Sequence, residues 1–274
     1  MLSYRHAFHA GNNADILKHW VIERVLAYMV QKDKPLHYID THAGCGLYDL
    51  TTETANKTAE YLHGSARLGA VTDAPEAFVP YLKLLESFAP FYPGSPSVAA
   101  RCLRPVDELS LCELHPKDGP ELAAHFKKDR RAKIYQEDGF KRVVSLMPPK
   151  QKRAMVVIDP SYEIKNDYEK VVAIIKDIHK RFSGAVVALW YPVVDIPRIQ
   201  KLATGIKKIG AKNTLQIELR TRAQSARGMA ASGMFILNAP WTLTDQANEV
   251  MPWLSEVLAE DDSAGFQVVQ LTEG

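Results

Sequence analysis

The sequence predicts an α/β fold with a largely parallel central sheet. Short runs of β-forming residues alternate with longer segments whose apolar residues recur at helical spacing, which is the pattern of successive strand–helix units. Several of these runs, such as VVI at 156–158, are apolar throughout, as expected for buried strands. With 274 residues, 46% of them hydrophobic and 24% charged, the chain has a globular composition and enough length to bury a sizeable core.

The first part of the chain predicts a helix, a strand and a helical insertion. Residues 14–31 carry Ile16, Trp20 and further apolar residues at helical spacing, and a short strand follows at 36–40. About seventy residues separate this strand from the next one, near residue 111, which exceeds a simple crossover between parallel strands. The surplus predicts a helical insertion within a single domain of residues 1–274; the insertion spans 48–95, and its expected helices are 56–72 and 76–88.

From residue 95 onward, strand and helix patterns alternate regularly. The turn YPGSP precedes a helix that starts near residue 97. Strands that alternate with helices in this way carry helices on both faces of the sheet. The expected strands are ELSLCELHP, AKIYQEDGF with its turn, RAMVVIDP, GAVVALWYPV, and, as the final strands, NTLQIELR and GMFILNAP. Further helices are expected at 120–129, 166–182 and 195–209.

Charge and cysteine content narrow the class of protein. The formal net charge is +2, so any surface for nucleic acid has to be a local patch. The three cysteines are scattered and form no CxxC pair, which argues against a disulfide framework and against a zinc site. The first fifteen residues are polar, unlike a signal peptide, and no uncharged apolar run approaches the length of a membrane span. We therefore expect a cytoplasmic protein.

Three of the expected strands end in residues suited to binding a ligand, and ligands of open α/β sheets bind beyond the carboxyl ends of the strands. The stretch DTHAGCG has two glycines that let a ligand approach the backbone, although it is not GxGxxG and an ordinary tight turn is the alternative. Glu113 closes the next strand, where an acid either holds ribose hydroxyls or faces solvent. Asp138 and Gly139 follow a third strand, where they either face the edge of a base or form a plain turn.

The fourth strand end, in VVIDPSYEIKNDY, carries the most distinctive chemistry. Pro160 cannot donate a hydrogen bond to the sheet, so the strand must stop there. The carboxylate of Asp159 and the carbonyl of Pro160 are then free to accept hydrogen bonds beyond the sheet, next to the flat ring of Tyr162. Two acceptors and a ring suit a planar amine with two N–H groups, such as the exocyclic amine of a base. A turn whose tyrosine packs against the sheet is the alternative, but four strand ends agree in order and spacing.

Several motifs together resemble one family. DTHAGCG is similar to the S-adenosylmethionine-binding turn of class I methyltransferases, and DPSY is similar to their amino-methylating motif, (D/N)PP(Y/F/W). This implies a Rossmann-like class I methyltransferase sheet. That motif has a second proline where this chain has Ser161. Serine leaves the φ angle less restricted than proline and has a free N–H, and we expect this to affect the rate more than the kind of reaction. The segments that resemble the RlmJ family of 23S ribosomal RNA adenine-N6 methyltransferases span nearly the whole chain: MLSYRHAFHAGNNADILKH, YIDTHAGCG, YPGSP, ELHP, EDGF, LWYPV and SGMFILNAPW.

The resemblance implies S-adenosyl-L-methionine as the cofactor and the N6 amine of an adenine in 23S rRNA as the methyl acceptor. Asp159, Pro160 and Tyr162 are the implied catalytic residues, and Tyr4 is implied to contact the substrate together with Tyr162. The implied cofactor-binding residues are His19, His42, Ser95, Glu113, Asp138, Gly139 and Asp159, with Gly44 and Lys18 beside them.

We further expect a monomer that acts on rRNA free of ribosomal proteins. No metal is expected, because His6, His9 and His19 have no carboxylate at a ligand spacing.

Two other functions stay open. DPSY does not distinguish DNA from RNA, so a DNA adenine-N6 methyltransferase is the second hypothesis, although the lack of an evident target-recognition domain favours a structured RNA recognised by shape. The third hypothesis is a non-catalytic nucleic-acid-binding protein, linked to the use of external DNA, that lost activity through Ser161. The retained Asp159 and Tyr162 argue against it.

Overall fold

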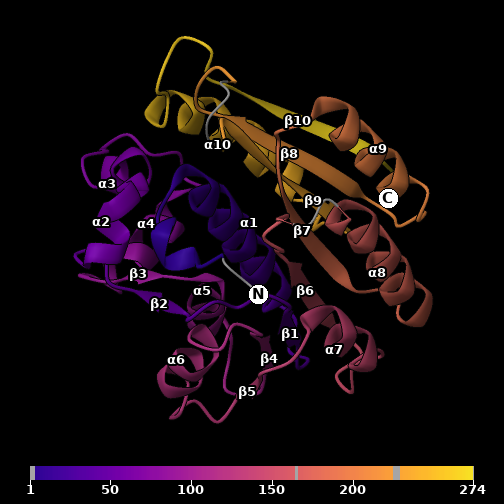
Figure 1. The fold of residues 1–274 in the computed structure, drawn as a ribbon. Coiled ribbons are helices and arrows are strands. Elements are labelled where there is room, and N and C mark those ends of the chain that lie inside the picture. The colour runs from indigo at the N-terminus through magenta and orange to yellow at the C-terminus, as the bar shows by residue number, and fades with distance from the viewer. Residues whose placement is uncertain (1–3, 164–165, 225–228, 274) are drawn as a thin grey trace.

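The computed structural model describes residues 4–163, 166–224 and 229–273, and within them eight strands form one central sheet (Figure 1). The strand order is β10-β8-β9-β7-β6-β1-β4-β5. The strands are β1 (His37–Asp40), β4 (Glu108–Cys112), β5 (Ala132–Tyr135), β6 (Ala154–Ile158), β7 (Val186–Pro192), β8 (Thr214–Arg220), β9 (Ala231–Leu237) and β10 (Gly265–Thr272). A separate ribbon pairs β2 (Leu47–Tyr48) with β3 (Tyr92–Pro93).

The predicted, largely parallel sheet is confirmed. β1 pairs in parallel with β4 and β6, β4 pairs in parallel with β5, and β6 with β7. β9 is antiparallel to both β7 and β8, and β10 is antiparallel to β8, so β9 and β10 run against the other strands. The chain proceeds from β1 to β5 on one side and from β6 to β7 on the other, so the strand order reverses between β1 and β6. A ligand-binding crevice opens at such a switch point.

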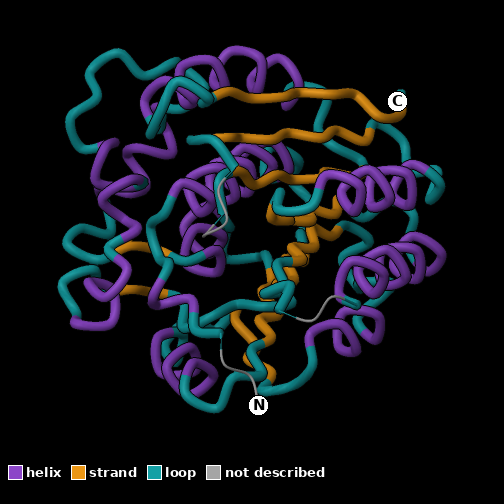
Figure 2. Tube along the Cα trace, turned by 45° about the horizontal axis from the view of Figure 1, so that its top comes forward, coloured by secondary structure: helices purple, strands orange, loops and turns teal. Residues whose placement is uncertain are grey.

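Helices cover both faces of the sheet, as predicted, and Figure 2 shows the sheet between the two helical layers. Successive strand residues alternate between the two faces: Met155 and Val157 of β6 belong to one hydrophobic cluster, and Val156 and Ile158 belong to the other. The first cluster includes α1 (Asn13–Met29), α5 (Ser95–Cys102), α6 (Asp118–His125) and α10 (Leu243–Val257), and the second includes α7 (Gly139–Ser145), α8 (Asp167–Arg181) and α9 (Ile196–Lys207).

The helix expected at 14–31 is confirmed as α1, which is buried nearly all round. Asn12 caps its start, because its side chain accepts a hydrogen bond from the backbone N–H of Asp15 at 2.9 Å. Trp20 is fully buried, and its indole N–H donates to the carbonyl of Ala77. The same helix also buries two charged side chains, Asp15 and Lys18. Buried charges require partners, so α1 points to a polar site at the edge of the sheet.

Short helices lie between β2 and β3, inside the region 48–95. The expectation of one helix over 56–72 is wrong. Ala59 has a left-handed φ of 52°, and Gly64 has a φ of −122° with a ψ of −107°, and neither conformation continues a helix. The observed elements are α2 (Glu53–Thr58), η2 (Glu60–His63) and α3 (Ser65–Leu68), followed by α4 (Val79–Glu86) inside the expected 76–88. The division of residues 1–274 into one domain with an insertion at 48–95 stays a prediction.

Two other expectations need correction. The turn expected at Asp138 and Gly139 is also the start of a helix, α7, which Asp138 caps. β8 and β9 are not the final strands, because α10 and β10 follow them. Pro252 lies inside α10 and interrupts the helical pattern of its sequence. β10 is an edge strand whose burial does not alternate, so its sequence lacks the usual strand pattern. In the part of the chain that the structure describes, no helix is long and apolar enough to cross a membrane.

Candidate active site

A cavity of about 1000 Å³ opens at the switch point, beyond the carboxyl ends of β1, β4 and β6. Its size lies at the upper end of the range for small-molecule sites, which leaves room for more than one ligand group. The structure brings together every residue that the sequence singled out for catalysis, cofactor or substrate. They are Tyr4, Lys18, His19, His42, Gly44, Ser95, Glu113, Asp138, Gly139, Asp159, Pro160 and Tyr162.

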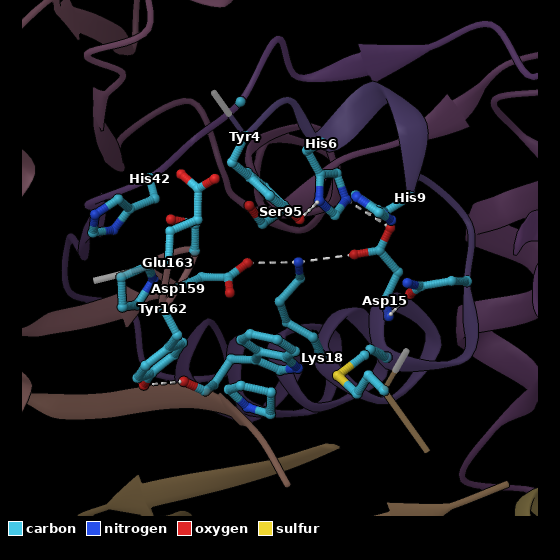
Figure 3. Close-up of a pocket in the computed structure, with 18 of the residues that line it drawn as sticks. Tyr4, His6, His9, Asp15, Lys18, His42, Ser95, Asp159, Tyr162 and Glu163 are labelled. Atoms are coloured by element: carbon cyan, nitrogen blue, oxygen red, sulfur yellow. Dashed lines mark hydrogen bonds and ion pairs between the residues drawn. The ribbon is translucent and has the colours of Figure 1, made fainter. Parts of the chain in front are cut away.

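Lys18 links Asp159 to Asp15 inside this cavity (Figure 3). Its Nζ lies 2.7 Å from Oδ2 of Asp159 and 2.8 Å from Oδ1 of Asp15. Burial acts to lower the pKa of Lys18, but the two carboxylates raise it above its ordinary value, so the ammonium group stays charged. Lys18 thereby fixes one oxygen of Asp159. The other oxygen makes no hydrogen bond to any residue that the structure describes, and it is available to a ligand.

Asp15 extends this network to the N-terminal segment. Its Oδ2 accepts a 2.9 Å hydrogen bond from the backbone N–H of Gly11 and lies 2.9 Å from Nε2 of His6. Burial acts to raise the pKa of Asp15, but the interactions with His6 and Lys18 lower it well below its ordinary value. Nδ1 of His6 lies 2.9 Å from the hydroxyl of Tyr4. A continuous chain of contacts therefore runs from the end of β6 to Tyr4.

The DPSY turn leaves the sheet as predicted. Over the described ranges, the carbonyl oxygen of Pro160 accepts no protein hydrogen bond, and the N–H of Ser161 donates none. Tyr162 has a φ of 54°, which is uncommon for a residue with a side chain and is typical of functional sites. Its hydroxyl donates to the carbonyl of Trp190 at 2.7 Å, and its ring lies 4.5 Å from that of Tyr168 between centroids. These contacts fix the ring in the cavity wall.

Glu113 follows β4 and is held by two backbone N–H groups. Its Oε2 accepts from Gly44 at 2.8 Å, and its Oε1 accepts from His115 at 2.7 Å. Burial raises the pKa of Glu113, and the two backbone donors oppose that shift. Each carboxylate oxygen keeps a further lone pair for a ligand. Gly44 has a φ of 60°, and a Cβ there would lie 2.3 Å from the hydroxyl of Tyr48, so this turn requires glycine.

Asp138 and Gly139 bring the start of α7 against the end of β1. Asp138 accepts a 2.9 Å hydrogen bond from the backbone N–H of Phe140, which caps the helix. A Cβ on Gly139 would lie 2.0 Å from the carbonyl oxygen of Thr41. The two backbones can approach this closely only because residue 139 has no side chain. Backbone atoms therefore form this part of the cavity wall.

His42 and Ser95 supply hydrogen-bond acceptors. The hydroxyl of Thr41 donates to the carbonyl of Val157 at 3.1 Å, so Nδ1 of His42, 2.8 Å from the same hydroxyl, carries the ring proton. Burial lowers the pKa of His42 to about 4, so the ring is neutral and its Nε2 is an acceptor. The hydroxyl of Ser95 donates to Asp40 at 2.7 Å, which leaves the oxygen of Ser95 as an acceptor.

His19 is fully buried and contributes an unpaired polar atom. Its Nδ1 lies 3.1 Å from the hydroxyl of Tyr92, whereas its Nε2 has no hydrogen-bond partner in the described segments. Burial lowers the pKa of His19 to about 3, so the imidazole is neutral. Because most buried polar atoms are paired, an unpaired one beside a cavity indicates a group that a ligand completes.

The burial of His19 predicts a loss of stability in mild acid. The unfolded chain binds a proton at this residue below about pH 6.5, whereas the folded chain resists protonation down to about 3. The free energy of unfolding should therefore fall as the pH drops from about 6.5 toward 3. Urea unfolding of the wild type and of His19→Gln at several pH values measures this, and the variant should show a weaker dependence. An equal pH dependence in the wild type and in His19→Gln would contradict the interpretation.

Sequence reasoning missed the part that Asp15 and His6 play. Asp15 stands three residues before Lys18, on the same face of α1, and this spacing of an acid and a lysine is the signal that could have revealed it. His6 and His9, considered as metal ligands, each contact a carboxylate instead, that of Asp15 and that of Glu60. Among the residues placed by the structure, no group of three or more histidines, cysteines and acids is arranged to hold a metal ion.

The fold and the cavity define the class of protein. A doubly wound sheet whose strand ends present acidic residues and a glycine-rich turn to a cavity at the switch point is the arrangement of a class I methyltransferase.

Comparison with known proteins identifies the family within that class. A family model described as RsmJ, Ribosomal RNA large subunit methyltransferase D, RlmJ, matches residues 33–272. Two curated relatives are named Ribosomal RNA large subunit methyltransferase J. The one from Escherichia coli (strain K12) is 45% identical over 264 residues, with 94% of each chain covered. The one from Haemophilus influenzae (strain ATCC 51907 / DSM 11121 / KW20 / Rd) is 41% identical over 279 residues, with 99% of each chain covered.

A crystal structure of a protein from Legionella pneumophila str. Philadelphia 1 has a TM-score of 0.88 and 32% identity to this chain, and it covers 96% of this chain and 98% of its own. The chain belongs to the RlmJ family of ribosomal RNA large subunit methyltransferases. The family, the fold class and the enzyme class predicted from the sequence are confirmed.

Proposed function

We propose that this enzyme methylates the exocyclic N6 amine of an adenine in 23S rRNA. Its family makes it a ribosomal RNA methyltransferase that uses S-adenosyl-L-methionine. One observation supports N6: an oxygen of Asp159 and the carbonyl of Pro160 are both unpaired in the described structure and lie beside Tyr162 in one cavity. A planar amine donates two hydrogens to two such acceptors, whereas a ring carbon or a ribose hydroxyl does not.

The residues of the cavity fit S-adenosylmethionine. Glu113 would accept hydrogen bonds from the ribose hydroxyls, and Asp138 would accept one from the adenine amine of the cofactor. The unpaired Nε2 of His19 would meet a polar group of the cofactor, and the close backbone approach of Gly139 to Thr41 would form part of the wall around it. When bound, the cofactor supplies a methyl group on a positively charged sulfur, which makes that methyl group electrophilic.

Asp159 and Pro160 prepare the adenine nitrogen for attack. N6 is a weak nucleophile, because its lone pair is delocalised into the purine ring. Acceptance of its two hydrogens by the Asp159 carboxylate and the Pro160 carbonyl favours a pyramidal nitrogen with an available lone pair. Holding this nitrogen in line with the methyl group supplies much of the rate. As the new N–C bond forms, the bond from the methyl carbon to sulfur breaks, and its electron pair stays on sulfur. The nitrogen loses a proton, and Asp159 would accept it.

Lys18 and the two tyrosines support this step. The ammonium group of Lys18 binds one oxygen of Asp159, and Asp15 holds that ammonium from the other side, so the carboxylate cannot turn away from the substrate. Tyr162 would stack on the adenine that has left the RNA helix, and Tyr4 would contact it from the N-terminal segment. Stacking offsets the cost of a few kcal/mol of removing a base from its helix.

The proposed enzyme is a cytoplasmic monomer that acts on RNA free of ribosomal proteins. The target adenine must enter a cavity at the sheet edge, so the surrounding RNA has to be accessible to the enzyme. This favours naked rRNA over an assembled subunit.

A comparison of nucleic acids tests the substrate. Deproteinised rRNA should accept methyl groups at least ~10-fold faster than transfer RNA or duplex DNA, because a structured RNA with an accessible adenine requires little energy for base extrusion. The rRNA should come from a strain that lacks the gene for this protein, so that the target is unmodified. Labelled methyl incorporation is measured for all three nucleic acids at one salt concentration. Equal or faster methylation of DNA would contradict the proposal and favour a DNA methyltransferase.

Cofactor binding should stabilise the fold. At a hundredfold excess over Kd, S-adenosylhomocysteine should add ~2.7 kcal/mol by mass action, which corresponds to a rise in Tm of roughly 5–10 °C. Glu113→Ala should weaken this rise, whereas Glu86→Gln, an exposed glutamate outside the cavity, should not. Calorimetry that shows no binding of S-adenosylmethionine or S-adenosylhomocysteine would contradict the assignment of this cavity to the cofactor.

A further inference from the structure

The ring of Tyr4 is supported by His9, a residue with no part in the proposed reaction (Figure 3). Tyr4 is 37% exposed, so the core of the protein does not fix its ring. The rings of Tyr4 and His9 are nearly parallel, with an interplanar angle of 8° and centroids 5.4 Å apart. The Tyr4 hydroxyl contacts Nδ1 of His6. Two histidines therefore set the position of this tyrosine, one at its hydroxyl and one against its face.

Glu60, from the short helix η2, holds both His9 and the start of α1. Its Oε1 lies 2.8 Å from Nδ1 of His9, and its Oε2 accepts a 2.9 Å hydrogen bond from Nδ2 of Asn12. The hydrogen bond to Glu60 raises the pKa of His9, and burial opposes the shift. A protonated imidazole is a better partner for the face of a tyrosine ring than a neutral one.

The backbone around η2 also binds this segment. The N–H of Ser65 donates to the carbonyl of Gly11 at 2.7 Å, and the hydroxyl of Thr58 donates to the carbonyl of Phe8. A Cβ on Gly64 would lie 2.1 Å from that same carbonyl of Gly11, so the two backbones touch. We call residues 58–65 the η2 platform. Its backbone and side-chain contacts hold residues 8–12 in place.

We propose that the η2 platform positions Tyr4 in the active site, with His9 and Glu60 as positioning residues for methyl transfer. The proposal rests on the proposed function, in which Tyr4 contacts the substrate. Without Glu60 the imidazole of His9 loses the partner that fixes its plane, and Tyr4 loses its support. Asp159, Lys18 and the cofactor residues keep their own contacts. The helices between β2 and β3 therefore contribute to catalysis without supplying a reacting group.

A double-mutant cycle between His9 and Tyr4 tests this. Single-turnover methyl transfer to deproteinised rRNA is measured for the wild type, His9→Ala, Tyr4→Ala and the double variant. His9→Ala should lower the rate ~10-fold in the wild-type background but less than about twofold when Tyr4 is already alanine, because a missing ring cannot be misplaced. Losses that multiply independently would overturn the proposal.

Variants of Glu60 separate positioning from folding. Glu60→Gln keeps an acceptor for His9 and should retain the rate within about threefold, whereas Glu60→Ala should lose about tenfold. Glu86→Gln, an exposed glutamate of α4 in the same region, is the matched control and should leave the rate unchanged. A wild-type rate in Glu60→Ala would overturn the proposal.

The imidazole NMR signals of His9 report the contact without reference to activity. In the wild type they should be displaced by the ring current of Tyr4, and their titration should give a pKa above the ordinary histidine value. Tyr4→Leu should remove the displacement, and Glu60→Gln should lower the pKa. If the imidazole signals of His9 are the same in Tyr4→Leu as in the wild type, the proposal is overturned even if the enzyme is active. Suppose that Tyr4→Leu removes the displacement and Glu60→Gln lowers the pKa of His9, but the wild-type protein methylates no RNA. The structural role of the η2 platform would then be supported, and the proposed function would be contradicted.

Discussion

Replacing Asp159 by alanine is expected to lower the rate of methyl transfer by roughly three orders of magnitude. In the proposed reaction the carboxylate has two roles: it accepts a hydrogen bond from N6, and it then takes the proton that the nitrogen loses. Alanine can do neither. The fold should persist, because Asp159 lies beyond the last residue of β6 and the buried Lys18 keeps its 2.8 Å contact with Asp15. Single-turnover kinetics on deproteinised rRNA measures the loss.

Asp159→Asn is the matched control, because it keeps the shape of the side chain and one acceptor oxygen but removes the charge that faces Lys18. It should retain more activity than alanine while remaining far below the wild type. Circular dichroism and Tm distinguish lost chemistry from lost structure. Near-normal turnover in Asp159→Ala would mean that DPSY is a structural turn and that another residue activates the amine.

Replacing Gly139 by alanine is expected to destabilise the fold and abolish cofactor binding together. The new Cβ would lie 2.0 Å from the carbonyl oxygen of Thr41, and that oxygen belongs to backbone that cannot rotate away. α7 must then move from the end of β1, which should lower the free energy of unfolding by about 3 kcal/mol and Tm by roughly 10 °C. The displaced helix carries Asp138 with it, so the proposed cofactor site would lose part of its wall and a hydrogen-bond acceptor together.

Gly184→Ala is the control for this substitution, because a Cβ at residue 184 makes only an ordinary contact of 3.7 Å, with the ring of Phe182. It should leave Tm and cofactor affinity close to those of the wild type. Thermal unfolding gives Tm for each variant, and calorimetry gives its affinity for S-adenosylhomocysteine. Wild-type affinity in Gly139→Ala would show that α7 does not form the wall of the cofactor site.

The parts of the fold that the sequence predicted well are the ones with strong periodicity. α1, α8 and the strands β6 and β7 carry apolar patterns that hardly depend on their surroundings, so their positions follow from the sequence alone. Strand ends were equally informative. Glu113, Asp138 and Asp159 follow the strands β4, β5 and β6. Parallel pairing of β4 and β6 with β1, and of β5 with β4, brings their loops to a single edge of the sheet.

What the sequence did not reveal depends on contacts between distant segments. The break of the expected helix 56–72 at Ala59 and Gly64 follows from the approach of the N-terminal segment, which no local pattern encodes. β10 is held by its pairing with β8, an antiparallel contact between residues far apart in the chain. The contact between His9 and Glu60 joins residues fifty-one positions apart, and only the folded chain brings them together.

The central claim is that the acceptor is the N6 amine, and nucleoside mass spectrometry tests it most directly. Wild-type enzyme is incubated with S-adenosylmethionine that carries a trideuterated methyl group and with rRNA from a strain that lacks its gene. The RNA is then digested to nucleosides. We expect a single deuterated product, N6-methyladenosine, which should be absent when Asp159→Ala replaces the wild-type enzyme. A deuterated methyl group on a ring carbon, a ring nitrogen or a ribose hydroxyl would contradict it.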